Sequence, residues 1–146
     1  MNAIIYPVGH HIAIRDLFVR EDLRKNDIIF IYNDNDVKKI TAMKISKDNN
    51  LLLVCEKRER SCCISVYNLI KPNFNVITII KPKRRIITTL YEEFISACFS
   101  IDGNYIACIS SVMKNGNKIL FGVVWDIQVF QPFKEDNYKV IFLIFN

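Results

Sequence analysis

The sequence predicts an all-β protein built from repeated four-stranded units, and three observations support this fold class. Short apolar runs rich in Ile, Val, Phe and Tyr alternate with turn clusters rich in Asn, Asp and Gly. Runs of about 5–7 residues at such close spacing are typical of β-sandwiches, barrels and propellers. The segment FSIDGNYIAC, residues 99–108, joins two of these runs through Asp102-Gly103, a pair that tolerates the positive φ of a tight hairpin turn. The third observation is that this hairpin occurs a second time, earlier in the chain.

The apolar runs define the expected strands in order. The N-terminal region has one expected strand at residues 12–17, followed by a charged stretch at 18–26 that we interpret as a loop. The first full unit has expected strands at residues 28–32, 40–45, 51–55 and 64–69. The second full unit has them at residues 76–80, 94–99, 105–109 and 119–127, and the run at 140–145 would open a further unit.

Two stretches of the chain align residue by residue. KISKDNNLLLVC at residues 44–55 matches CFSIDGNYIACI at 98–109, with an offset of 54 residues (102 − 48). ISVYNL at 64–69 matches GVVWDI at 122–127 with an offset of 58 (126 − 68), so the second copy has four extra residues in the loop at 110–118. IAIRDL at 12–17 is a third, partial copy of the last strand. The repeat signature consists of Ser46, Asp48, Tyr67 and Asn68 in the first copy and Ser100, Asp102, Gly103, Trp125 and Asp126 in the second.

A repeat of about 40–45 residues with four strands and a terminal Trp-Asp pair is typical of WD40 propeller blades. The longer spacing here falls in loops, and no copy carries a Gly-His pair before its second strand. The sequence therefore predicts a partial WD40 β-propeller with two full four-stranded blades and flanking partial-blade strands. Because known propellers use about 4–8 blades, we expect the remaining blades to come from further chain or from other subunits.

This interpretation divides the chain into four parts. Residues 1–25 would hold the last strand of an incomplete blade and a loop, and residues 26–70 a WD40-type blade. Residues 71–130 would hold a second blade, and residues 131–146 the start of a further blade or a non-native end.

Composition and charge narrow the classes of function. Hydrophobic residues make up 51% and charged residues 24% of the chain, which is typical of a globular domain. The formal net charge of +5 permits an acidic partner without requiring one. An odd number of cysteines, five, argues against a secreted disulfide framework and favours a reducing compartment. No apolar run reaches the roughly 18 residues of a transmembrane helix.

The sequence offers no arrangement of residues suited to catalysis. His10 and His11 are adjacent, so on a strand they would point to opposite faces and would not share a metal ion. Cys62 and Cys63 are also adjacent and lack the spacing of zinc ligands. We found no glycine-rich phosphate loop, no paired carboxylates and no Ser-His-Asp arrangement. We therefore expect no catalytic residues, no cofactor and no metal, and a protein that is not an enzyme.

The strongest charge feature is the segment KPKRR, which contains Lys81, Lys83, Arg84 and Arg85. It lies between two expected strands, where a solvated loop is common. Two other interpretations remain open: docking on an acidic protein surface, and contact with nucleic acid or the nuclear-import machinery. The segment lacks the interleaved aromatic residues that favour nucleic-acid binding.

Several segments together resemble the N-terminal propeller of the large WD-repeat cilia- and flagella-associated proteins. They are YPVGHHIAIRDL, KITAMKISKDNNLLLVCEK, ISVYNL, EEFISACFSIDGNYIA and VVWDI, which span most of residues 5–132. The resemblance implies a non-enzymatic scaffold in the axoneme of motile cilia or flagella, linked to dynein or microtubule-associated complexes. In that setting, the charge of the basic segment Lys81 to Arg85 suits docking on the acidic tails of tubulin. The long coiled coil of the family has no counterpart here, and the repeat-signature residues carry over as structural parts only. The alternative is a nuclear or RNA-linked WD40 adaptor that uses the basic segment Lys81 to Arg85.

Overall fold

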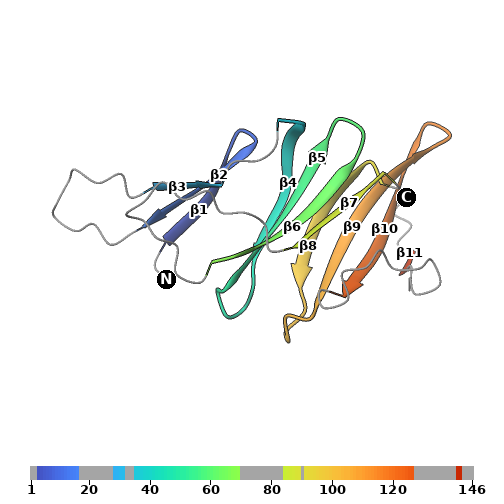
Figure 1. Cartoon of the computed structure of the whole chain (residues 1–146). Helices are drawn as coiled ribbons and strands as arrows, with labels where there is room; N and C mark the ends of the chain where they lie inside the picture. Colours follow the sequence, from blue (N-terminus) through green and yellow to red (C-terminus); the bar gives the residue numbers. More distant parts are fainter. Residues whose placement is uncertain are drawn as a thin grey trace.

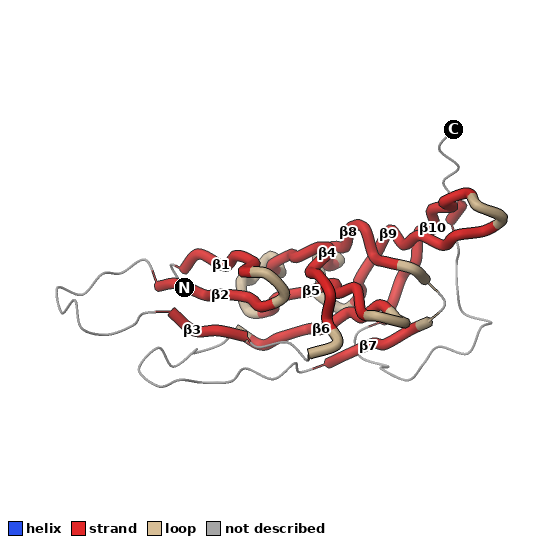
Figure 2. Tube along the Cα trace, turned by 90° about the horizontal axis from the view of Figure 1, so that it is seen from above, coloured by secondary structure: helices blue, strands red, loops and turns tan. Residues whose placement is uncertain are grey.

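The described part of the chain folds into three antiparallel β-sheets that stand side by side (Figure 1). The structure, a computed structural model, describes residues 3–16, 28–31, 35–69, 84–89, 91–126 and 141–142. Every regular element within these residues is a strand, which confirms the all-β prediction. Viewed from above, strands of the three sheets follow one another along the molecule (Figure 2).

Each sheet is formed by strands that follow one another in the sequence. The N-terminal sheet has the order β1 (Ala3–Val8), β2 (His11–Asp16) and β3 (Ile28–Ile31). The central sheet contains β4 (Val37–Ile45), β5 (Leu51–Arg58), β6 (Cys62–Asn68) and β7 (Arg84–Thr88) in that order. The C-terminal sheet contains β8 (Glu93–Phe99), β9 (Tyr105–Lys114), β10 (Asn117–Asp126) and β11 (Ile141–Phe142) in that order.

The structure corrects how the expected strands are grouped into sheets. The run at residues 28–32 was expected to open the first full unit, but Ile28–Ile31 pairs with β2 and closes the N-terminal sheet. The run at 140–145 was expected to open a further unit, but Ile141–Phe142 pairs with β10. In both cases the strand continues an antiparallel meander. Strands β1 and β7 were not predicted, and the expected strand at 76–80 lies outside the described residues.

The last strands of the three sheets recur at a constant spacing. The aligned segments of the repeat begin at Ile12, Ile64 and Gly122. These three residues are paired with Ile31, Ile86 and Ile141, respectively. The residues on β3, β7 and β11 therefore lie 55 residues apart in each step (86 − 31 and 141 − 86). The repeat therefore extends to the closing strand of every sheet, including the strands that the sequence had assigned to other units.

A β-bulge occurs at the same repeat position in the first strands of the central and C-terminal sheets. On β4, Ile40 and Ala42 are paired with consecutive residues of β5, which leaves Thr41 as the extra residue. On β8, Phe94 and Ser96 are paired with consecutive residues of β9, which leaves Ile95 as the extra residue. The two extra residues are 54 positions apart, the same offset as the repeat signature.

The central sheet is buried on both faces. Side chains alternate between the faces of a strand, so Leu53 and Cys55 of β5 pack against the C-terminal sheet, whereas Leu52 and Val54 pack against the N-terminal sheet. The core on the C-terminal side also contains Ile64, Val66, Phe94, Ile106, Val123 and Trp125. The core on the N-terminal side also contains Ile12, Ile14, Ile31, Tyr67 and Leu69. The three sheets thus form one packed stack.

Candidate functional site

The first copy of the repeat signature forms a hydrogen-bonded turn between β4 and β5. The Ser46 hydroxyl donates to Asp48 Oδ1 at 2.5 Å, and the Asn50 side-chain amide donates to Asp48 Oδ2 at 2.8 Å. The backbone N–H of Leu51 in turn donates to Ser46 Oγ at 2.9 Å. The turn also requires a positive φ of 59° at Asn49, a conformation that Asn adopts more readily than most residues.

The second copy reproduces this turn between β8 and β9. The Ser100 hydroxyl donates to Asp102 Oδ1 at 2.5 Å, the Asn104 amide donates to Asp102 Oδ2 at 2.9 Å, and the Tyr105 N–H donates to Ser100 Oγ at 2.9 Å. Gly103 takes the place of Asn49, with φ of 72°. The hydroxyl of the preceding Ser is the main cause that lowers the pKa of Asp48 and of Asp102. Both aspartates therefore have local partners within the turn.

The aromatic residues of the signature occupy equivalent buried positions. Tyr67 is paired with Leu52 across β5 and β6, and Trp125 is paired with Ile106 across β9 and β10. Tyr67 lies in the core on the N-terminal side of the central sheet, and Trp125 lies in the core on its C-terminal side. These residues therefore pack the sheets, and the adjacent Asn68 and Asp126 end their strands.

The predicted basic contact segment is only partly described. Lys81 and Lys83 lie outside the described residues. Arg84 and Arg85 are the first residues of β7, and their backbones pair with Val66 and Ser65. The expectation that these two arginines belong to a loop is therefore wrong, because β6 offers them an antiparallel partner strand.

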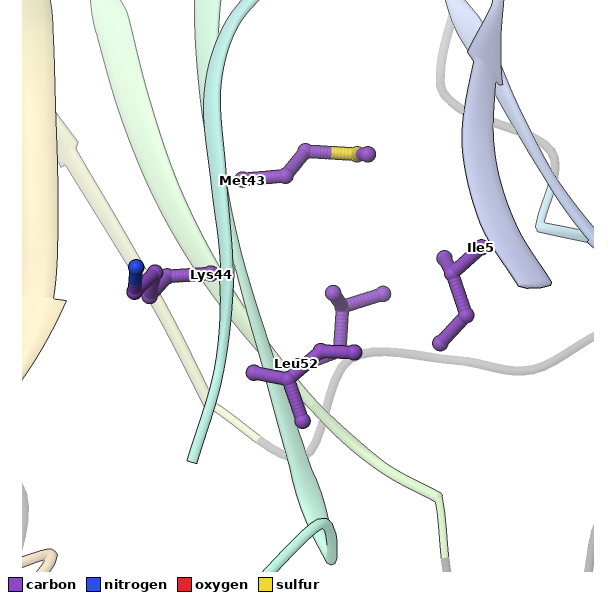
Figure 3. A pocket seen from close by; sticks show the side chains of 5 residues that line it. Ile5, Met43, Lys44 and Leu52 are labelled. Carbon is purple, nitrogen blue, oxygen red and sulfur yellow. The ribbon is translucent and has the colours of Figure 1, made fainter. Parts of the chain in front are cut away.

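A groove lies between the N-terminal and central sheets. It has a volume of about 420 Å³ and is lined by Ile5, Met43, Lys44, Ile45 and Leu52. Figure 3 shows Ile5 on one side of this space and Met43 and Leu52 on the other, whereas Lys44 extends away from it. The lining is mostly apolar. Sequence reasoning missed this groove because it depends on which sheets become neighbours.

The groove adjoins an open sheet edge. In the repeat, β1 holds the place of β5 in the central sheet and of β9 in the C-terminal sheet. β5 pairs with β4 and β9 pairs with β8, but among the described residues no strand pairs with β1 on the side away from β2. Val8 and His11 close the two-residue turn at 9–10 and form a hydrogen-bonded pair. Hydrogen-bonded and non-hydrogen-bonded pairs alternate along an antiparallel ladder, so Ile5 and Ile14 form a non-hydrogen-bonded pair. Ile5 therefore directs its N–H and C=O away from β2, and Pro7, which has no N–H, occupies the next outward position.

A buried polar network was also missed. Arg58 Nη2 donates to Glu56 Oε2 at 3.2 Å, and Arg58 Nη1 donates to Asp36 Oδ2 at 2.9 Å. The side chain of Glu56 is fully buried and that of Arg58 is 6% exposed. The second copy has Ser110 at the position of Glu56, so this network belongs to the central sheet and not to the repeat.

Ion pairs join the central and C-terminal sheets at their surface. Glu93 on β8 accepts from Lys118 on β10 at 2.8 Å and lies 3.0 Å from Lys39 on β4. The hydrogen bond from Lys118, followed by that from Lys39, lowers the pKa of Glu93 from 4.5 to about 2. A second pair joins Lys57 of β5 to Glu92 at 3.1 Å. These contacts hold the two sheets together.

The cysteines and histidines form no metal site within the described residues. Cys55, Cys62, Cys63 and Cys108 are buried thiols and Cys98 is exposed. Burial is the main cause that raises the pKa of Cys62 to about 12, which disfavours the reactive thiolate. His10 belongs to the turn and His11 begins the strand β2. The argument that two strand residues point to opposite faces therefore does not apply to this pair, whose ring centroids lie 4.0 Å apart.

Comparisons with known proteins give no assignment. No protein-family model matches the sequence, and no curated protein matches it. The described part of the chain contains no helix long and apolar enough to cross a membrane.

Proposed function

We propose that this chain is part of a WD40-type β-propeller and acts as a non-enzymatic protein-interaction scaffold. The supporting observation is that two stacked four-stranded sheets repeat the same turn, the same bulge and the same buried aromatic position at a fixed register. Stacked antiparallel meanders of this kind are the building units of propellers. Units that contact only their neighbours present extended surfaces to partners.

The groove beside β1 is the proposed binding position for a partner. Strand addition to an exposed sheet edge gives affinity through backbone hydrogen bonds and selectivity through pockets for alternate side chains. The outward N–H and C=O of Ile5 supply backbone hydrogen bonds. The space between Ile5, Met43 and Leu52 supplies a pocket for a side chain. The proposed partner is an extended segment with apolar side chains at alternate positions.

A peptide with the sequence of β4, VKKITAMKI, is a suitable probe because β4 holds the corresponding place in the central sheet. We expect saturable binding of one labelled peptide per chain by fluorescence anisotropy. N-methylation of alternate residues along one peptide edge should abolish binding, while methylation along the other edge should preserve it. Absence of binding, or equal binding of both methylated peptides, would contradict strand addition at β1.

The axonemal setting of the scaffold rests on the resemblance to WD-repeat cilia- and flagella-associated proteins. We expect a tagged copy, expressed in a ciliated or flagellated cell of its source, to remain with the axoneme after detergent extraction. Accumulation in the nucleus would instead support the adaptor interpretation of the basic segment.

The basic segment is the proposed contact with acidic tubulin tails, through long-range electrostatic attraction. Replacing Lys81, Lys83, Arg84 and Arg85 with Ala should weaken co-sedimentation with microtubules, and the wild-type binding should decrease as salt rises. The matched control is removal of the tubulin tails by subtilisin, which should weaken wild-type binding to a similar degree. Unchanged binding of the fourfold variant would exclude this contact.

A further inference from the structure

The two outer sheets each expose one mostly apolar face whose counterpart in the central sheet is buried, and the face of the N-terminal sheet also carries the exposed Arg15. We call the face that contains Leu53 and Val66 the front of the central sheet, and the face that contains Leu52 and Tyr67 its back. The front of the central sheet packs against the back of the C-terminal sheet. The front of the N-terminal sheet, with Ile12 and Ile14, packs against the back of the central sheet. Both contacts inside the chain are therefore front to back.

The front of the C-terminal sheet is uncovered among the described residues. Val66 is paired with Leu53 in the central sheet, and Val124 is paired with Ala107 at the same repeat position. Val66 is 1% exposed, whereas Val124 is 46% exposed. Tyr105 of β9 is also exposed on this face. The repeat thus places apolar side chains on a surface that no described sheet covers.

The back of the N-terminal sheet is uncovered in the same way. Ile4 is paired with Arg15, and Leu52 is paired with Tyr67 in the central sheet. The two pairs occupy the same repeat position. Leu52 is 1% exposed, whereas Ile4 is 48% exposed. Ile28, the other partner of Arg15, is exposed on the same face. In Figure 1 this sheet and the C-terminal sheet lie at opposite ends of the stack.

We propose that the front of the C-terminal sheet docks on the back of the N-terminal sheet of a second copy of this chain. The occupant follows from the repeat, because a front meets a back at both contacts inside the chain and each copy presents one of each. Such a head-to-tail contact is heterologous and generates either a ring or an open polymer. Two copies joined by two identical contacts close a ring of six sheets. This closure rests on the propeller fold proposed above, because known β-propellers have about 4–8 such sheets.

The mass of the full chain in solution tests this contact. At tens of micromolar, sedimentation equilibrium should give twice the chain mass of 17.1 kDa. Val124→Lys on the front face and Ile4→Lys on the back face should each yield a monomer. Ile101→Lys, a change at an exposed residue of the turn between β8 and β9 and outside the strands of both faces, should leave the dimer intact. Far-UV circular dichroism of each variant checks that the sheets remain folded, and Ala107→Lys replaces Val124→Lys if the latter unfolds.

Mixing the two monomeric variants tests the head-to-tail geometry. The Val124→Lys copy keeps an intact back face and the Ile4→Lys copy keeps an intact front face, so a 1:1 mixture should form a dimer through one contact. A wild-type monomer would overturn the proposal. A dimer that survives Ile4→Lys would indicate pairing of two like faces and would also overturn it. Species larger than two copies would contradict closure at six sheets.

Discussion

Asp48 and Asp102 hold equivalent turns in two different sheets, each accepting hydrogen bonds from a Ser hydroxyl two residues before it and an Asn amide two residues after it. The Ser hydroxyl in turn accepts from the backbone N–H that begins the next strand. One carboxylate therefore orders a whole hairpin. The match in distances across two copies indicates that the repeat conserves a mechanism of turn formation and not only a residue pattern.

The first prediction concerns these two aspartates. Asp48→Ala and Asp102→Ala should each lower the thermal unfolding midpoint by similar amounts, because each removes the acceptor of the same local network. The two effects should add in the double variant, since the turns belong to different hairpins and share no partner. Differential scanning fluorimetry measures the midpoints. Lys47→Ala, a change at an exposed neighbour in the first turn, serves as the control and should leave the midpoint unchanged.

The second prediction concerns the aromatic residues that close the repeat. Tyr67→Ala and Trp125→Ala remove large side chains that are 1% and 5% exposed. Each should lower the free energy of unfolding by about 3–5 kcal/mol, the usual cost of truncating a buried aromatic residue. Urea unfolding measures this loss, with Ile101→Ala, at a residue that is 86% exposed, as the control. Losses below about 1 kcal/mol at both positions would contradict their role in sheet packing.

The sequence predicted the strands better than it predicted the sheets. Runs such as 51–55 and 94–99 lie within strands β5 and β8, because β-branched and aromatic residues favour a packed pleated surface. The run at 28–32 was assigned to the wrong sheet because an apolar pattern does not specify a partner. In the structure the decisive feature is the meander, which keeps each strand beside its predecessor.

The candidate sites were less accessible to sequence reasoning. Arg58 lies in the charged segment CEKRERS, a composition typical of a solvated hairpin loop, yet it ends β5 as a buried residue with Glu56 two positions before it. The i, i+2 spacing that puts both side chains on one face of a strand was the available signal. The groove beside Ile5 had no such signal, because it forms between strands β1 and β4 that are distant in the sequence.

The third prediction concerns the buried ion pair. Arg58→Met leaves the Glu56 carboxylate buried without this cation and should cost about 3–5 kcal/mol of unfolding free energy. Combining it with Glu56→Leu should restore a large part of that loss, because a well-packed apolar pair can replace a buried ion pair. Asp36→Asn should have a smaller effect, since the Asp36 side chain is 51% exposed. A urea-unfolding double-mutant cycle measures the coupling, and strictly additive losses would contradict it.

The fourth prediction concerns acid stability and the carboxylate that joins two sheets. Because Lys118 and Lys39 lower the pKa of Glu93 from 4.5 to about 2, the native state keeps this carboxylate charged at pH values where the unfolded chain protonates it. Glu93 therefore adds stability above about pH 4.5, and this contribution is lost as the pH falls toward 2. In Glu93→Gln the slope of unfolding free energy against pH in this window should decrease by up to about one proton. Lys118→Met should flatten the slope in the same direction, while Lys118→Arg, which keeps the cation, should retain it. Urea unfolding at pH 2.5, 3.5, 4.5 and 6 measures the slope, and a wild-type slope in both Glu93→Gln and Lys118→Met would show that this carboxylate does not couple the sheets to pH.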